Sequence, residues 1–158
     1  MTRSRASVRA SLDRLHRDDS GNAIIEFVYL AVLLMVPLVY VLLTVFRVQG
    51  AAYAVSSAAR EAGRVYATSE TVDAAGDRAV AAAAIVMSDS GLELDPQQLD
   101  IVCSDDPCLT PGATVDVRMG HEVPLPLLPD FLDGSAPASV HVTSEHLEVV
   151  DRFRAGAG

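Results

Sequence analysis

A long uncharged apolar run near the N-terminus constrains this chain more than any other feature. From Phe27 to Thr44 no side chain carries a charge, and Arg47 closes the segment. About 20 mostly apolar residues are enough to span the hydrocarbon core of a bilayer as a helix. We therefore expect residues 22–48 to form a membrane-spanning helix.

One carboxylate, Glu26, lies at the mouth of this run. A charged side chain in the bilayer costs roughly 2.5–3.5 kcal/mol at the centre and less near the interface, so Glu26 should have a cationic partner. Cleavage after Gly21 would supply one, because Asn22 would then carry a free α-ammonium group one helical turn from Glu26. The pair could form within one chain or between neighbouring subunits.

The residues around Glu26 resemble the processing junction of type IV prepilins. A basic leader and a small residue, Gly21, precede the cut, Glu26 is the fifth residue after it, and Phe27 follows. A second run, AAREAGRVY over 58–66, makes the chain similar to the TadE-like minor pilins, or pseudopilins, of tight-adherence (Tad/Flp) pilus systems. The likeness covers residues 21–66 and returns faintly over 148–154.

The resemblance implies a structural subunit of a pilus or of a related secretion apparatus. A prepilin peptidase would remove residues 1–21, and the Tad assembly platform in the membrane would pass the mature chain into a bundle with other pilins. Glu26 and Phe27 would then act in subunit assembly. No cofactor follows from this resemblance.

Charge is distributed unevenly along the chain and predicts its orientation. Residues 1–21 hold five Arg against three Asp, whereas the remainder carries seven Arg against eighteen acidic residues. Basic residues beside an apolar run keep that end in the cytoplasm, so residues 49–158 are expected outside the cytoplasmic membrane, possibly as part of a surface pilus. An acidic exterior also argues against nucleic-acid binding.

The apolar periodicity predicts an α+β fold of pilin-like layout. The first helix continues out of the membrane to about Tyr66, because small apolar residues recur at three- and four-residue steps. A second helix is expected from an N-cap at Thr71 to about Ser88, with Gly91 as its stop. From residue 97 the period becomes two, which predicts a three-stranded antiparallel sheet.

The expected strands cover 98–104, 113–122 and 138–149. The apolar parity slips between Val142 and Leu147, which predicts a bulge or strand end near Ser144. The proline-rich segment 123–129 is expected to be an extended loop, since Pro cannot donate in a central strand. It would either cover the sheet or contact a partner.

Two cysteines, Cys103 and Cys108, enclose a turn-forming sequence. In an exported domain this spacing predicts a disulfide, and two Cys alone make a poor zinc site. His141 and Glu145 share a strand parity, but surface histidines are the simpler interpretation. No nucleophile elbow, metalloprotease helix, phosphate loop or dinucleotide fingerprint occurs, so no enzyme activity, metal or small-molecule substrate is expected.

A cluster of charges on the first helix is open to two interpretations. Arg60 and Arg64 are one turn apart, and Glu61 can pair with Arg64 at i, i+3. The cluster is either a solvated charged face or a contact that sets the register of the next subunit in a fibre.

Two other functions remain compatible with the sequence. The chain could be a secreted binding domain released by signal peptidase at the small-x-small sequence Ala52-Tyr53-Ala54. It could also be a single-pass membrane scaffold that is never cut. The first residue of the mature protein would separate these possibilities.

Overall fold

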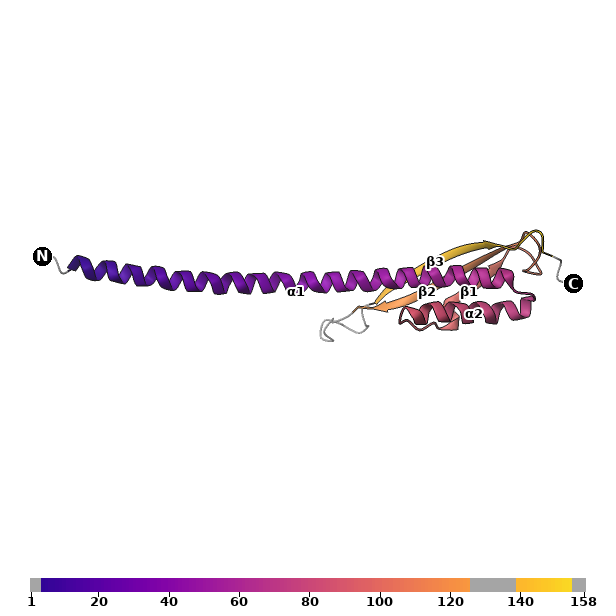
Figure 1. Ribbon diagram of the computed structural model, residues 1–158, viewed down its shortest axis with the longest axis horizontal. Helices are drawn as coiled ribbons and strands as arrows, with labels where there is room; N and C mark the ends of the chain where they lie inside the picture. The colour runs from indigo at the N-terminus through magenta and orange to yellow at the C-terminus, as the bar shows by residue number, and fades with distance from the viewer. Residues whose placement is uncertain (1–3, 126–138, 155–158) are drawn as a thin grey trace. The chain divides into compact units, whose positions relative to one another are not determined.

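The computed structural model describes residues 4–125 and 139–154, with side chains from Asn22 onward. It contains two long helices, a 3-10 turn and three strands, which confirms the α+β class (Figure 1). In chain order the elements are α1 (Ser4–Thr68), α2 (Val72–Asp89), η1 (Pro96–Gln98), β1 (Leu99–Cys103), β2 (Thr114–Pro124) and β3 (Ser139–Val149).

The first helix begins much earlier than the sequence indicated. Helix was expected from residue 22, but α1 starts at Ser4 and passes through the Gly21–Asn22 bond. The leader 4–20 is rich in Arg, Ala, Leu and Asp and contains neither Gly nor Pro, so nothing in its backbone opposes helix. The absence of apolar periodicity therefore did not mean an absence of helix.

The chain divides into two compact units, Met1–Leu43 and Thr44–Gly158. The first unit is the N-terminal part of α1. The second holds the rest of α1, α2 and the sheet, and contains all of the buried core.

The sheet has the order β1-β2-β3, and both pairs of neighbours are antiparallel. The register of β2 with β3 runs without interruption from Thr114 opposite Val149 to Pro124 opposite Ser139. The expected bulge near Ser144 is therefore wrong.

The apolar parity of β3 slips because this strand lies at the edge of the sheet. Its inward positions near the C-terminal end, His146 and Glu148, are only half-buried, so polar side chains are tolerated there. Leu147 and Val149 occupy outward positions and are 59% and 49% exposed. The change of apolar parity in β3 therefore reflects apolar residues on the outer face of an edge strand, and the strand itself has no bulge.

The proline-rich segment also differs from the expectation at its start. Val123 and Pro124 belong to β2, where they lie opposite Val140 and Ser139. Val123 is buried, and Pro124 is the last residue of the strand, where the missing donor costs least. Residues 126–129 of the expected loop lie outside the described residues.

The core of the second unit is built mainly from small side chains. Buried alanines of α1 and α2 share one cluster with the inward-facing residues of β2. The buried residues at these contacts include Ala51, Ala54, Val55, Ala58, Ala59, Ala62, Ala75, Ala79, Ala83, Val115, Val117 and Met119. The buried alanines of α1 and α2 thus belong to one core with the inward face of β2.

The ends of α2 follow the sequence signals in part. Thr71 is the N-cap residue as expected, but its side chain makes no capping bond, and its carbonyl accepts from Ala75 N–H at 3.1 Å. At the other end Gly91 has φ +71, Gly91 N–H donates to Ser88 O and Leu92 N–H donates to Met87 O. This is a Schellman stop, which requires a residue with positive φ.

Gly63 is the closest approach between α1 and the sheet. A Cβ at this position would meet His146 Cδ2 at 3.3 Å, Glu148 Cβ at 3.4 Å and Val117 Cγ2 at 3.5 Å. Glycine here lets the helix lie directly against β2 and β3.

Gly63→Leu should therefore destabilise the folded chain, although Leu is the better helix former. Overpacking lowers the free energy of unfolding by about 1–3 kcal/mol, and a side chain forced between helix and sheet belongs at the upper end of that range. Replacing a helical Gly raises it by only about 1 kcal/mol, so the net effect is a loss of stability. Denaturant unfolding of the full chain in detergent would measure this. Gly50→Leu is the matched control: a Cβ there meets nothing within 4 Å, so stability should hold or rise. Equal stability of both variants would contradict the close approach.

Candidate functional site

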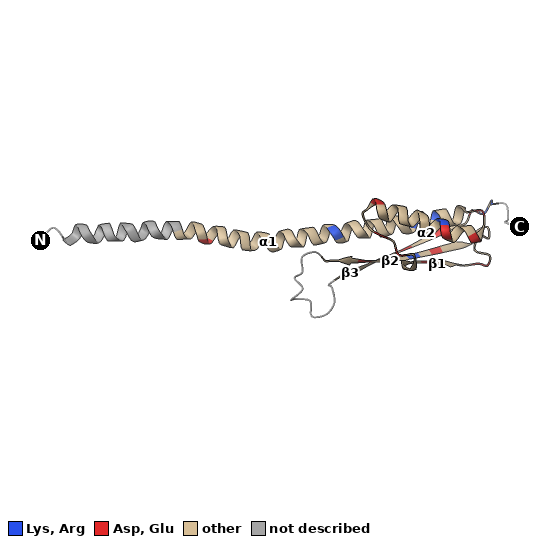
Figure 2. Cartoon of the chain, turned by 90° about the horizontal axis from the view of Figure 1, so that it is seen from below, with Lys and Arg blue, Asp and Glu red and all other residues tan. Residues whose placement is uncertain are grey.

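Most large side chains in the apolar segment of α1 are exposed in the part of the chain that the structure describes. Within the described residues one helix is long and apolar enough to cross a membrane, and none of its most apolar window is buried. Figure 2 shows this part of α1 as an uninterrupted tan stretch between an acidic and a basic position, which are Glu26 and Arg47 in the sequence. Large apolar side chains that water would contact from all sides require a bilayer or other helices around them.

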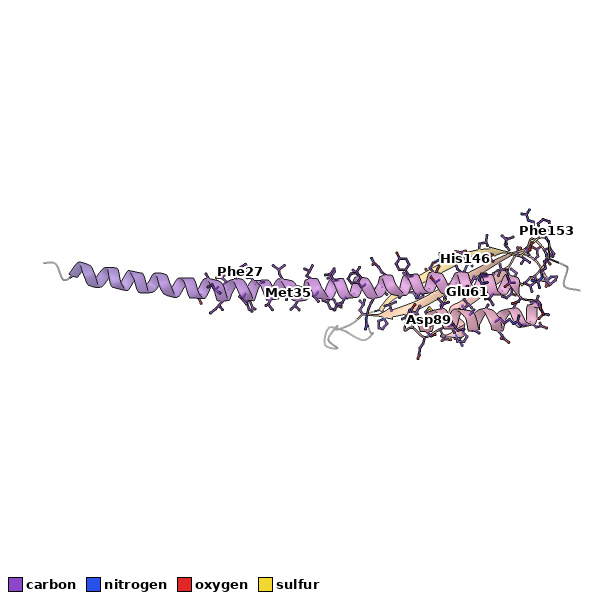
Figure 3. The ribbon with its side chains drawn as sticks, in the orientation of Figure 1. Phe27, Met35, Glu61, Asp89, His146 and Phe153 are labelled. Carbon is purple, nitrogen blue, oxygen red and sulfur yellow. A yellow bond between two sulfur atoms is a disulfide. The ribbon has the colours of Figure 1, made fainter. Side chains whose placement is uncertain are left out.

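Glu26 and Phe27 lie at the start of this exposed stretch. Both are exposed, and Phe27 is 72% accessible, so neither is engaged by the rest of the described chain (Figure 3). Asn22 precedes Glu26 by one helical turn, which puts the two residues on the same face of α1. A positive charge at Asn22 would therefore be within reach of the carboxylate.

The expected processing bond between Gly21 and Asn22 lies inside α1. Gly21 does not mark the start of the helix, because α1 extends on both sides of it. Glycine is the weakest helix former after proline, so Gly21 lowers the helix propensity of α1 at this bond.

The expected pair between Glu61 and Arg64 is confirmed. Arg64 Nε donates to Glu61 Oε2 at 3.0 Å, and Arg64 Nη2 donates to Glu61 Oε1 at 2.5 Å. This two-bond contact holds the pKa of the Glu61 carboxyl below its ordinary value, because the guanidinium stabilises the charged form. Arg60 is exposed and makes no ion pair within the described residues, so the structure groups Glu61 with Arg64 and leaves Arg60 apart.

A polar contact of β3 adjoins this pair and was not foreseen. His146 Nε2 and Glu148 Oε2 lie 3.2 Å apart on the strand that faces Gly63. The pKa of Arg64 is raised chiefly by its hydrogen bonds to Glu61, and the negative charge of Glu148 acts in the same direction. Glu148 lies near Arg64 because α1 packs against β3, and no local sequence pattern encodes this tertiary contact.

The cysteine pair forms the expected disulfide. Cys103 ends β1, Cys108 follows the turn, and their Cα atoms are 5.3 Å apart. Tyr66 OH lies 3.9 Å from Cys103 Sγ, so the bridge packs near the last turns of α1. The disulfide is therefore a structural tie at the end of the sheet.

Arg154 ties the C-terminal segment to the end of α1. Its guanidinium donates to Ala67 O at 3.1 Å, to Glu70 O at 2.9 Å and to Ser69 O. These carbonyls include unpaired acceptors at the helix C-terminus, where a cation is favoured. A sequence separation of more than 80 residues hid this contact from any local pattern.

The outer face of the sheet carries several ion pairs. Arg118 contacts Asp116 at 2.6 Å and Glu145 at 3.3 Å. His141 lies 2.9 Å from Glu122, whose pKa is lowered chiefly by the Ser139 hydroxyl. In the part of the chain that the structure describes, no three His, Cys, Asp or Glu side chains are grouped to hold a metal ion.

Comparison with known proteins gives no relative: no protein-family model, no curated protein and no solved structure matches this chain. Its function is therefore inferred from the residues and contacts described above.

The Glu61–Arg64 contact makes a pH-dependent prediction. Because the pKa of Glu61 is lower in the folded chain, the stability from this pair is present above the unfolded pKa and is lost as pH falls through the folded pKa. The carboxyl carbon of Glu61, followed by NMR in the full chain, should titrate below the ordinary glutamate range. In Arg64→Gln the midpoint should return to that range. An unchanged midpoint in the variant would show that the pair does not persist in solution.

Proposed function

We propose that this chain is a structural subunit of the TadE-like minor pilin or pseudopilin type, in a Tad/Flp-type pilus or a related secretion apparatus. The observation that carries the proposal is the N-terminal part of α1: an exposed apolar helix that bears one carboxylate a single turn beyond the expected cut. A plain membrane anchor needs the apolar surface but has no use for that carboxylate.

In this proposal the apolar helix has two successive environments. Before assembly it lies in the bilayer, where its internally bonded backbone is compatible with hydrocarbon. After cleavage at Gly21 by a prepilin peptidase, the same side chains pack against the helices of other pilins. The Tad assembly platform would mediate this transfer. The basic leader fits an N-terminus held inside, with the domain on the outer side of the membrane.

Glu26 is the residue that would recognise a neighbour. A carboxylate in a low-dielectric bundle requires a cation, and the α-ammonium of Asn22 in an incoming subunit would provide it. Phe27, beside it, would contribute apolar area to the same contact. The Glu61–Arg64 pair and the free guanidinium of Arg60 are exposed at the level of the folded domain, where they could set the register of adjacent subunits.

The alternative of release by signal peptidase has less support. Its site, Ala52-Tyr53-Ala54, lies within α1 where Ala51 and Ala54 are buried in the core. Cleavage there would remove Ala51 and separate the remaining helix from its N-terminal turns. A single-pass scaffold that is never cut remains the second candidate, because it needs only the apolar helix and the domain.

Mature protein should begin at Asn22. N-terminal mass spectrometry of the membrane fraction and of sheared surface material would test this, and Gly21→Arg should leave the full-length chain in the membrane. Gly50→Ala, a substitution of another α1 glycine, should leave processing unchanged. A first residue near Tyr53 would favour the secreted domain, whereas an intact Met1 in every fraction would favour the scaffold.

Glu26→Ala should leave membrane insertion intact, because it removes a charge from an apolar segment. Incorporation into the assembled fraction should fall, since the neighbour's ammonium would be buried without a partner at a cost of several kcal/mol. Glu26→Gln should behave like Ala, because the amide keeps shape but not charge. The measurement is the ratio of mature protein in sheared or platform-bound material to that in the membrane. Normal incorporation of both variants, with cleavage at Gly21 unchanged, would remove the main physical support for the pilin proposal.

A further inference from the structure

The C-terminal segment of the second unit presents one fully exposed aromatic side chain on a fixed backbone. Phe153 is 95% exposed, the highest value among the large apolar side chains described (Figure 3). Its own N–H donates to Asp151 Oδ1 at 2.8 Å. On one side Val150 is completely buried, and on the other Arg154 binds three backbone carbonyls at the end of α1.

Such an arrangement is suited to binding. An exposed phenylalanine does not stabilise the chain that carries it. The backbone around Phe153 is nevertheless held by hydrogen bonds on both sides, among them Val150 N–H to Ala113 O at 2.9 Å and Gly112 N–H to Val150 O at 3.0 Å. A preorganised aromatic loses little entropy when it enters a pocket, and aromatic residues are the commonest anchors of protein interfaces.

The opposite end of the same unit has a hollow of about 450 Å³. Its lining is mostly apolar or glycine, with one cation at the rim, and comprises Phe46, Arg47, Gly50, Ala51, Ser90, Gly91, Leu92, Val123 and Pro124. Gly50 contributes open space to it, because no atom lies within 4 Å of where a Cβ would be. A hollow of this size and lining can accept one aromatic ring.

The exposed Phe153 side chain, called the knob below, and the hollow lie at the two ends of one stretch of α1. Arg154 contacts Ala67, whereas the hollow is formed around Arg47 to Ala51. At 1.5 Å per residue this separates them by roughly 25–30 Å along the helix. In Figure 3, Phe153 lies at one end of the second unit, and Asp89, which precedes the hollow-lining Ser90, lies toward the other.

The charges beside the two features are complementary. Asp151 and Arg152 flank the knob and are exposed. Arg47 lines the hollow, while Asp89 and Glu93 lie in the chain on either side of its Ser90–Leu92 segment and are exposed. One copy can therefore offer a carboxylate to Arg47 and a guanidinium to the acidic pair, in a contact that no single chain can make with itself.

We propose that Phe153 of one copy inserts into the Arg47–Leu92 hollow of a second copy. The contact is heterologous, because two different surfaces meet, so each copy keeps one free knob and one free hollow and the series does not close at two. The inference rests on the proposed function, since it assigns an axial contact to a fibre subunit. One aromatic ring and two ion pairs bury too little surface to hold two copies together by themselves. The contact would therefore set the relative position of copies that are held together mainly by helix packing.

A photoreactive benzophenone analogue of phenylalanine at position 153 tests the contact in the full chain. Two copies with different affinity tags are expressed together, illuminated in membranes and in sheared material, and the joined peptides are identified by mass spectrometry. We expect joins to the peptides around Gly50, Leu92 or Val123 and a ladder that continues beyond dimers. Joins to residues around position 153 of the other copy, joins to the outer sheet face, or no joined copies at all would overturn the proposal.

Filling the hollow provides the matched test. Gly50→Leu should reduce the joined product about tenfold or more, as expected for loss of an aromatic anchor. Gly76→Leu adds the same side chain to α2, where a Cβ also meets nothing within 4 Å, and should leave the ladder intact. A ladder unaffected by Gly50→Leu would overturn the hollow as the site.

The two proposals fail in different ways. A chain that starts at Asn22 and enters sheared material, but joins elsewhere, contradicts only the contact between Phe153 and the hollow. A head-to-tail ladder from a chain that retains Met1 supports this contact and contradicts the pilin assignment.

Discussion

The N-terminal part of α1 pairs its backbone polar groups within the helix but leaves its apolar side chains exposed. The helix pairs nearly all backbone N–H and C=O groups of the apolar stretch, the exception being at Pro37, which has no N–H to donate to the Leu33 carbonyl. The side chains from Ile24 to Phe46 are nearly all exposed, and no described element of the chain covers them. Whatever the protein does, it must place this surface in lipid or against other helices. The carboxylate of Glu26 at its start adds a second constraint, because a charge at the edge of an apolar surface is stabilised where a cation can reach it.

The second unit depends on small residues in place of a large core. Alanine contributes little apolar area per side chain, so stability comes from close approach of α1, α2 and the sheet. Gly63 takes this to its limit, since even a Cβ would touch β3. A helix that is bulky and apolar in one half and small and closely packed in the other can serve two different environments without a break.

Much of the fold was predictable because its signals are local. Alternation in β2 and the spacing of Cys103 and Cys108 determine strand and disulfide, and Gly91 marks the end of α2 with a positive φ. The predictions failed where tertiary position altered the meaning of a pattern. Leu147 points outward because β3 is an edge strand, and the leader is helical although it has no apolar face. The Arg154 contact and the exposed Phe153 depend on where the chain returns in space, which no local period encodes.

The bond between Arg154 and the end of α1 has a consequence for the order of folding. α1 is synthesised well before Arg154, so the carbonyls of Ala67, Ser69 and Glu70 can accept from that guanidinium only after the intervening residues have been made. β3, the long partner of β2, also comes late in synthesis. The second unit therefore cannot complete these contacts until residue 154 has been synthesised, and contacts of such large sequence separation form slowly. During synthesis α1 is thus present before the sheet that packs against it is complete.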